Sequence, residues 1–108
     1  MATGQHTIDY IIDQLSSLSH VSARKMFGEY ALYCNGKVVG LVCDDALFVK
    51  ITVRGREFVG DYYQEGRAFR GAKPSMLIDE AQIEDREWIS ELIQITFDDL
   101  PYGKVVRR

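Results

Sequence analysis

Apolar residues recur at helical spacing near the start of the chain. The stripe follows the i, i+3, i+4, i+7 pattern of an amphipathic helix and consists of Ile8, Ile11, Ile12, Leu15 and Leu18. Polar residues lie between them, without the basic face that membrane-surface helices carry. The pattern predicts a helix that packs on a core, with Thr7 as its N-cap.

Residues 24–51 predict three antiparallel strands joined by two tight turns. Asn35-Gly36 is a dipeptide well suited to a two-residue hairpin turn, and Asp44-Asp45 can form a second one. These turns set a register in which the facing pairs are Cys34 and Lys37, Tyr33 and Val38, Leu32 and Val39, Ala31 and Gly40, Tyr30 and Leu41, Val42 and Leu47, and Leu41 and Phe48. The sequence therefore predicts a three-stranded meander.

Both faces of this meander are predicted to be mainly apolar. Alternation places on one face Ala31, Tyr33, Val38, Gly40, Val42, Leu47, Val49 and Ile51. It places on the other Tyr30, Leu32, Cys34, Val39, Leu41, Cys43, Phe48 and Lys50. Antiparallel sheets commonly have one solvated face, and large exposed apolar patches mark interaction surfaces. We therefore expect either that helices cover both faces or that one face meets another chain.

A second helix is predicted after the meander. Phe58, Val59, Tyr62 and Tyr63 lie on one side at helical spacing, and Gly66 is a suitable residue to end the helix. Residues at this spacing are more often part of a core than a platform on which bases stack.

A short strand and a last helix complete the predicted fold. Residues 75–78 predict the strand, and the apolar stripe from Trp88 to Leu100 predicts the helix, with a capping box at Asp79 and Gln82. The predicted architecture is a two-layer α+β fold with an antiparallel sheet and the order α-β-β-β-α-β-α. We expect residues 1–108 to form a single domain with a flexible tail at residues 101–108.

Composition and charge narrow the classes of function. The chain is 46% apolar and 27% charged, with a net charge of −3. Nucleic-acid binding needs clustered positive charge, so this balance argues against direct nucleic-acid contact. No apolar run approaches the roughly 18 residues of a membrane span, and no signal peptide is recognised. We expect a soluble cytoplasmic protein without a membrane partner.

The residues offer no strong catalytic or metal-binding pattern. The predicted register places Cys34 and Cys43 about 20 Å apart, too far for a disulfide. Neither CxxC nor HxxxH spacing occurs, and GxGxxG and phosphate-loop signatures are missing. We expect no catalytic residue, metal or cofactor, although an enzyme site assembled from scattered residues stays open as an alternative.

Basic residues in the segment 66–75, which is predicted to be a loop or an edge strand, are candidates for an anion contact. They are Arg67, Arg70 and Lys73, with Arg54 and Arg56 upstream. Acidic residues are interleaved with them, so a solvated rim is the simpler interpretation.

One stretch resembles a known family. An Arg-x-Met-Phe-Gly start, formed by Arg24, Met26, Phe27 and Gly28, is followed by Tyr30, Leu32 and Tyr33, by Leu-Phe-Val-Lys ending at Lys50, and by Lys-Pro-Ser-Met over residues 73–76. This pattern resembles the N-terminal domain of the TfoX/Sxy competence-regulator family, over residues 10–100. Leu77 and Ile78 follow where many members carry aromatic residues.

The resemblance implies a fold and a role. It implies an α+β fold similar to secretion chaperones and a part in switching on DNA-uptake genes, with the cyclic-AMP receptor protein as partner of the full-length regulators. We expect a stand-alone, non-enzymatic regulatory module that binds a protein partner, either transcription machinery or a second copy as a homodimer. The residues expected to contact that partner are Arg24, Lys50, Arg67, Arg70 and Lys73. The alternative is a small enzyme or ligand-binding domain with a pocket between sheet and helices.

Overall fold

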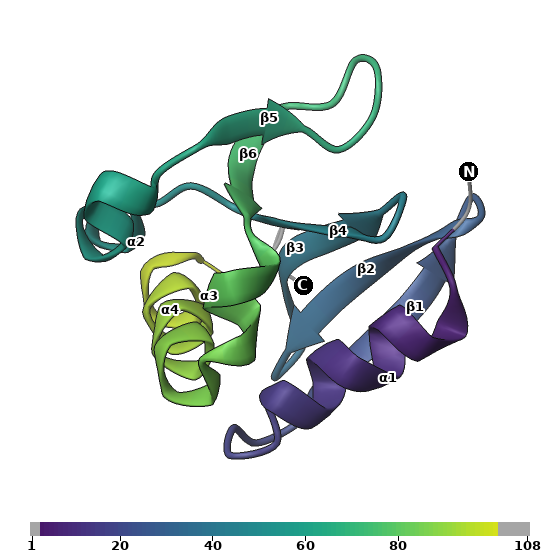
Figure 1. Ribbon diagram of the computed structural model, residues 1–108, viewed down its shortest axis with the longest axis horizontal. Coiled ribbons are helices and arrows are strands. Elements are labelled where there is room, and N and C mark those ends of the chain that lie inside the picture. The colour runs from purple at the N-terminus through teal and green to yellow at the C-terminus, as the bar shows by residue number, and fades with distance from the viewer. Residues whose placement is uncertain (1–2, 102–108) are drawn as a thin grey trace, which may run out of the picture.

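The fold is an α+β arrangement of one antiparallel sheet with helices, as the sequence predicts (Figure 1). The computed structural model describes residues 3–101, and the tail predicted at residues 101–108 lies almost wholly outside them. Within the described part of the chain, no helix has the length and apolar character needed to cross a bilayer.

The described residues form six strands, four α-helices and one short 3-10 turn. The strands are β1 (Val21–Met26), β2 (Glu29–Cys34), β3 (Lys37–Cys43), β4 (Ala46–Val49), β5 (Glu65–Arg67) and β6 (Pro74–Ile78). The helices are α1 (Gln5–Gln14), α2 (Val53–Val59), the 3-10 turn η1 (Gly60–Tyr62), α3 (Glu80–Glu84) and α4 (Arg86–Asp99).

The sheet has six strands, whereas the prediction gave a three-stranded meander and one further strand, β6. Its order is β1-β2-β3-β4-β6-β5, so the additional strands β1 and β5 form its two edges. Both edges are mostly polar or short, which is how natural sheets discourage further pairing. For the same reason their sequences carry little of the apolar alternation that identifies a strand.

Three tight turns with positive φ at both central residues connect the first four strands. The two predicted turns are confirmed, with φ of 50° and 85° at Asn35-Gly36 and of 54° and 62° at Asp44-Asp45. A third turn joins β1 to β2 at Phe27-Gly28, with φ of 52° and 84°. Such turns match the natural twist of paired strands.

A β-bulge in β3 changes the predicted faces of the sheet. Next to the turn the register is as predicted, but Leu32 pairs with Gly40 instead of Val39. Val39 is the extra residue on β3, and every pair further from the turn is shifted by one position. The pairs between β3 and β4 are confirmed. The predicted faces were therefore wrong beyond the bulge, because a shift of one residue exchanges the two sides of a strand.

The observed faces differ in what covers them. One face joins the helices in a single core and contributes Tyr30, Leu32, Cys34, Val39, Val42, Leu47, Val49, Met76 and Ile78. The other, which we call the open face, carries Ala31, Tyr33, Val38, Leu41, Cys43, Phe48 and Leu77. Figure 1 shows α1, α3 and α4 on one side of the sheet, and the β5–β6 hairpin continues the sheet beyond β4. Helices therefore cover one face, so the predicted alternative in which they cover both faces is wrong, and contact of the open face with another chain stays a prediction.

The helix ends differ in detail from the prediction. The prediction of Thr7 as the N-cap of α1 was wrong, because the helix begins at Gln5 and Gly4 takes the N-cap position. Thr7 lies within the helix, and its hydroxyl donates to Asp45 Oδ1 at 2.8 Å. Helix α2 ends at Gly60, with φ 57°, and Gly66 lies in strand β5.

The last predicted helix is divided in two. Asp79 takes the N-cap position of α3 but forms no side-chain capping bond. The Asp85 carboxylate accepts a hydrogen bond from Trp88 N at 3.1 Å and so starts α4 separately.

A buried lysine fastens the end of α4 to the sheet. Lys37 is 9% exposed, and its Nζ donates to the carbonyl oxygens of Phe97 at 2.7 Å and Leu100 at 2.5 Å. A positive charge is favourable at the C-terminal end of a helix, where carbonyl groups lack intrahelical donors. The β2–β3 hairpin is thereby tied to the helical layer.

Candidate functional site

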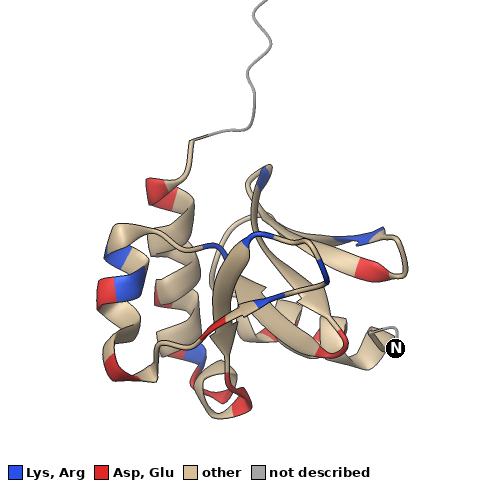
Figure 2. Cartoon of the chain, turned by 90° about the horizontal axis from the view of Figure 1, so that it is seen from above, with Lys and Arg blue, Asp and Glu red and all other residues tan. Residues whose placement is uncertain are grey.

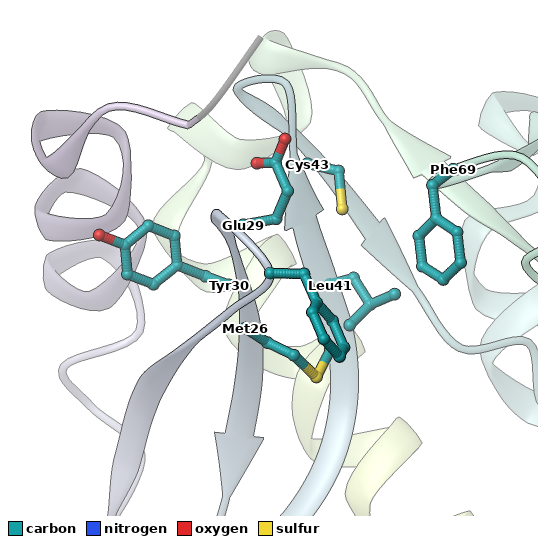
Figure 3. Close-up of a pocket in the computed structure, with 7 residues that line it drawn as sticks. Met26, Glu29, Tyr30, Leu41, Cys43 and Phe69 are labelled. Carbon is teal, nitrogen blue, oxygen red and sulfur yellow. The ribbon is translucent and has the colours of Figure 1, made fainter.

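The open face holds an apolar pocket at one end of the sheet (Figure 3). Its volume is about 320 Å³, and its lining is Met26, Phe27, Glu29, Tyr30, Leu41, Cys43 and Phe69. The β1–β2 turn and the loop between β5 and β6 supply its sides, and β2 and β3 supply its floor. The pocket therefore combines side chains from segments about 40 residues apart in the sequence.

The strand register explains how the floor is built. Met26 pairs with Glu29, and Leu41 pairs with Ala31 on one side and Phe48 on the other, so these residues form neighbouring rows of the open face. The Tyr30 ring points away from the pocket in Figure 3, and its hydroxyl donates to Gln5 Oε1 of α1 at 3.2 Å. Because Tyr30 faces the helices, Leu41 and Cys43 are the main side chains of the floor.

Three large apolar side chains at the pocket are exposed to solvent. Phe27 is 99% exposed, Phe69 54% and Met26 38%. Apolar side chains gathered around a hollow are typical of surfaces that bind a partner or ligand.

Phe27 occupies a backbone conformation that does not suit it. Its turn has the geometry of the Asn35-Gly36 turn within about 2° in φ. Asn is among the residues that tolerate this left-handed region, whereas a bulky side chain there is a genuine outlier. The ring gains no burial in return. An exposed aromatic ring in such a conformation is an outlier of the kind that motivates a functional hypothesis.

Glu29 holds this end of the sheet together. Its Oε1 accepts hydrogen bonds from Thr3 N at 3.1 Å, Thr3 Oγ1 at 2.5 Å and Asp44 N at 3.1 Å. The bond from the Thr3 hydroxyl is the main reason why the pKa of Glu29 is lowered. The carboxylate thus connects the β1–β2 turn, the β3–β4 turn and the N-terminal segment, and it fixes the side of the pocket that carries Phe27.

Asp45 makes a second connection of the same kind. Its Oδ1 accepts from Gly4 N at 3.0 Å as well as from the Thr7 hydroxyl. These bonds, with the Gly4 amide first, lower the pKa of Asp45. Both carboxylates are structural anchors of the turns.

The two cysteines are free, as the sequence predicts. Cys34 lies in the core, whereas Cys43 lies on the pocket floor and is 4% exposed. Burial is the main cause that raises the pKa of each thiol, and for Cys43 the nearby Glu29 and Asp44 carboxylates add to it. A thiol with a raised pKa is a weak nucleophile at neutral pH. Among residues 3–101, no group of three or more His, Cys, Asp or Glu side chains could hold a metal ion.

The predicted contact residues lie around the open face rather than in the pocket. Arg24 points to this face from β1, and alternation places Lys50 on it at the end of β4. Arg70 and Lys73 are exposed in the β5–β6 loop that carries Phe69, and Lys and Arg positions recur along this hairpin in Figure 2. Arg67 has a structural role, since its Nη1 donates to the Ala72 carbonyl within that loop.

Sequence reasoning missed the pocket residues themselves. Phe27 had a usable signal, because a residue followed by Gly between two strand-like runs can form a hairpin turn. Phe69 had no such signal, because its place depends on how a six-residue loop folds back over the sheet.

A second, shallower hollow of about 480 Å³ lies along the seam between α1 and the start of β1. It lies between a helix and a strand, which is the kind of position expected in the alternative prediction of a pocket between sheet and helices.

Comparison with known proteins gives two consistent matches. The sequence model of the family described as TfoX N-terminal domain matches residues 13–100. The chain is also 36% identical over 104 residues to a protein of Spirochaeta aurantia, described as an uncharacterized 12.7 kDa protein in the trpE 5′ region. That match covers 96% of this chain and 89% of the relative.

Proposed function

This chain belongs to the TfoX N-terminal domain family, and on that basis we propose that it is a non-enzymatic regulatory module that acts by binding another protein. The binding surface in this proposal is the open face, centred on the pocket between Phe27 and Phe69. Competence and transcription regulation in a bacterial cytoplasm are the setting that the family suggests.

The observation that carries the proposal is the exposed Phe27 in a strained turn beside an apolar pocket. Binding energy at protein interfaces is concentrated in a few aromatic and similar side chains near the centre of the contact. Phe27, Phe69 and Met26 provide such a group. Glu29 and Asp45 hold the turn beside them in place, so little ordering cost remains for association.

The pocket favours docking over chemistry. Its floor is formed by Leu41 and the Cys43 thiol, whose raised pKa leaves it protonated at neutral pH. Its one carboxylate, on Glu29, is already engaged by three donors. General acid–base catalysis needs a group within reach of substrate and with a pKa near the working pH, and a carboxyl group with a lowered pKa does not fit that need.

Site-specific photocrosslinking tests the proposed surface. A photoreactive phenylalanine analogue is placed at Phe27 or Phe69, and at Val53 as a control that is 75% exposed and lies in α2, outside the pocket lining. The expected result is a crosslinked partner protein from Phe27 and Phe69 and none from Val53. The purified partner should then bind the wild type but not Phe27→Asn. An adduct of twice the chain mass would identify the partner as a second copy.

Two results would overturn the proposal. One is the same set of adducts from all three positions. The other is a purified partner that binds the wild type and Phe27→Asn equally well.

A further inference from the structure

We propose that the partner of the open face presents a short acidic segment, in which one large apolar side chain enters the pocket and neighbouring carboxylates meet basic residues at its rim. This inference rests on the proposed function and adds the chemistry of the partner. It follows from the size of the pocket and from the charges around it.

The pocket has the size for one anchoring residue. Its 320 Å³ is at the lower end of the roughly 300–1,000 Å³ of ligand pockets. Leu41, Met26, Phe27 and Phe69 line it with hydrocarbon, and the Cys43 thiol behaves as a small apolar group. An aromatic or large aliphatic side chain would be dehydrated on most sides there.

The basic residues near the open face carry charges that the fold itself does not neutralise. Among residues 3–101, Arg24, Lys50, Arg70 and Lys73 take part in no ion pair. The helical layer differs, because Arg54 there pairs with Asp99 at 2.8 Å and Arg86 pairs with Asp13 at 3.2 Å. Unpaired positive charge around an apolar hollow is complementary to a partner with carboxylates beside an apolar anchor.

Arg24 is the best placed of these residues. It lies on the same side of β1 as Met26, two positions away, so it is one row of the sheet from the pocket. Its guanidinium carbon lies 5.8 Å from the centre of the Tyr33 ring, which keeps the charge over the open face. A carboxylate on the partner could reach Arg24 while the anchor fills the pocket.

Negative charge at the other side of the pocket gives the contact a direction. Glu29 and Asp44 lie at the turn end of the open face, and Arg24 and Lys50 lie further along the strands. An acidic segment is repelled from the first pair and attracted to the second. We therefore expect the carboxylates to lie on the Arg24 side of the anchoring residue.

Selection from a displayed library of random nine-residue peptides tests the inference with the full chain as target. The expected result is enrichment of peptides that combine Trp, Phe or Leu with Asp or Glu within a few positions. Binding of a selected peptide should weaken as salt is raised, because exposed charge pairs are screened beyond about 10 Å at 0.1 M salt.

Two charge reversals on one strand provide a matched pair. Arg24→Glu changes a residue of the open face, and Lys25→Glu makes the same change of charge at its neighbour, which points to the other face. We expect Arg24→Glu to weaken the selected peptide about tenfold at low salt and Lys25→Glu to weaken it less than about threefold. Equal effects of the two variants would overturn the inference.

The outcomes separate the inference from the proposed function. Peptides that are apolar but not acidic, and that lose binding in Phe27→Asn, overturn the inference and leave the docking surface standing. Acidic peptides whose binding is unchanged in Phe27→Asn overturn both. No enrichment overturns the inference, and the crosslinking experiment then decides the proposed function alone.

Discussion

Replacement of Phe27 by Asn should make the protein more stable while it removes the proposed activity. The change keeps the turn, since Asn35 occupies the equivalent position of the β2–β3 turn with nearly the same φ, 50° against 52°. It removes a side chain that is 99% exposed, so almost no buried apolar area is lost. Stability and binding should therefore move in opposite directions.

The size of the effect follows from the backbone. A left-handed conformation costs an ordinary residue roughly 1–2 kcal/mol, and Asn avoids part of that cost through its short polar side chain. We expect the free energy of unfolding to rise by about 0.5–1 kcal/mol. For a domain of this size that corresponds to an increase in Tm of about 2–6 °C.

Urea denaturation and thermal melts measure the change, and Asn35→Phe is the control. This reverse substitution places Phe in the equivalent turn, so it should lower stability by a similar amount without effect on partner or peptide binding. A loss of about 1 kcal/mol or more in Phe27→Asn would refute the reasoning, because the ring would then be packed within the fold. Unchanged partner binding would refute the role assigned to it.

Three further outcomes are expected. Gly40→Ala should destabilise the protein by about 1–3 kcal/mol in denaturant titration, because its Cβ would lie 2.4 Å from the Phe48 carbonyl oxygen; an unchanged midpoint would contradict this close approach. The lowered pKa of Glu29 stabilises the folded protein when the carboxyl group is ionised, and this stabilisation is lost as pH falls below about 4. Between pH 6 and 3 the free energy of unfolding should therefore fall less in Glu29→Gln than in the wild type. Parallel curves of unfolding free energy against pH would contradict this expectation. Iodoacetamide should modify Cys43 faster than Cys34 in the folded protein, because Cys43 lies in the pocket. Since the pKa of Cys43 is raised, its rate of modification should keep rising to a pH above the usual thiol pKa. Equal rates for the two cysteines would contradict an accessible pocket.

The sequence was sufficient to predict those turns whose residues favour the backbone conformation that the turn requires. Asn35-Gly36 and Asp44-Asp45 consist of residues that favour positive φ, and both turns are found where they were predicted. Phe27-Gly28 has the same geometry, but Phe is a poor residue for it, so Gly28 alone indicates the turn. The site was missed at the position where sequence and backbone disagree, which is where a functional residue is expected.

The bulge in β3 could not be predicted from the sequence for a different reason. Residues on either side of Val39 are apolar, so the alternation of β3 fits equally well with or without an extra residue. A strand with one polar face would have shown the shift as a break in its pattern. The pocket was out of reach as well, since it requires both the bulged register and the position of the loop that carries Phe69.

The extra residue at Val39 has a consequence for how relatives of this chain can diversify. Loss of Val39 would remove the bulge and leave a regular ladder, in which Leu41 still pairs with Ala31 and Val42 still pairs with Tyr30. Deletion of this single codon would therefore keep the recognition side chains on the open face and the helices in place. Among family members, this strand should vary in length by one residue at this point without a change in which side chains face outward.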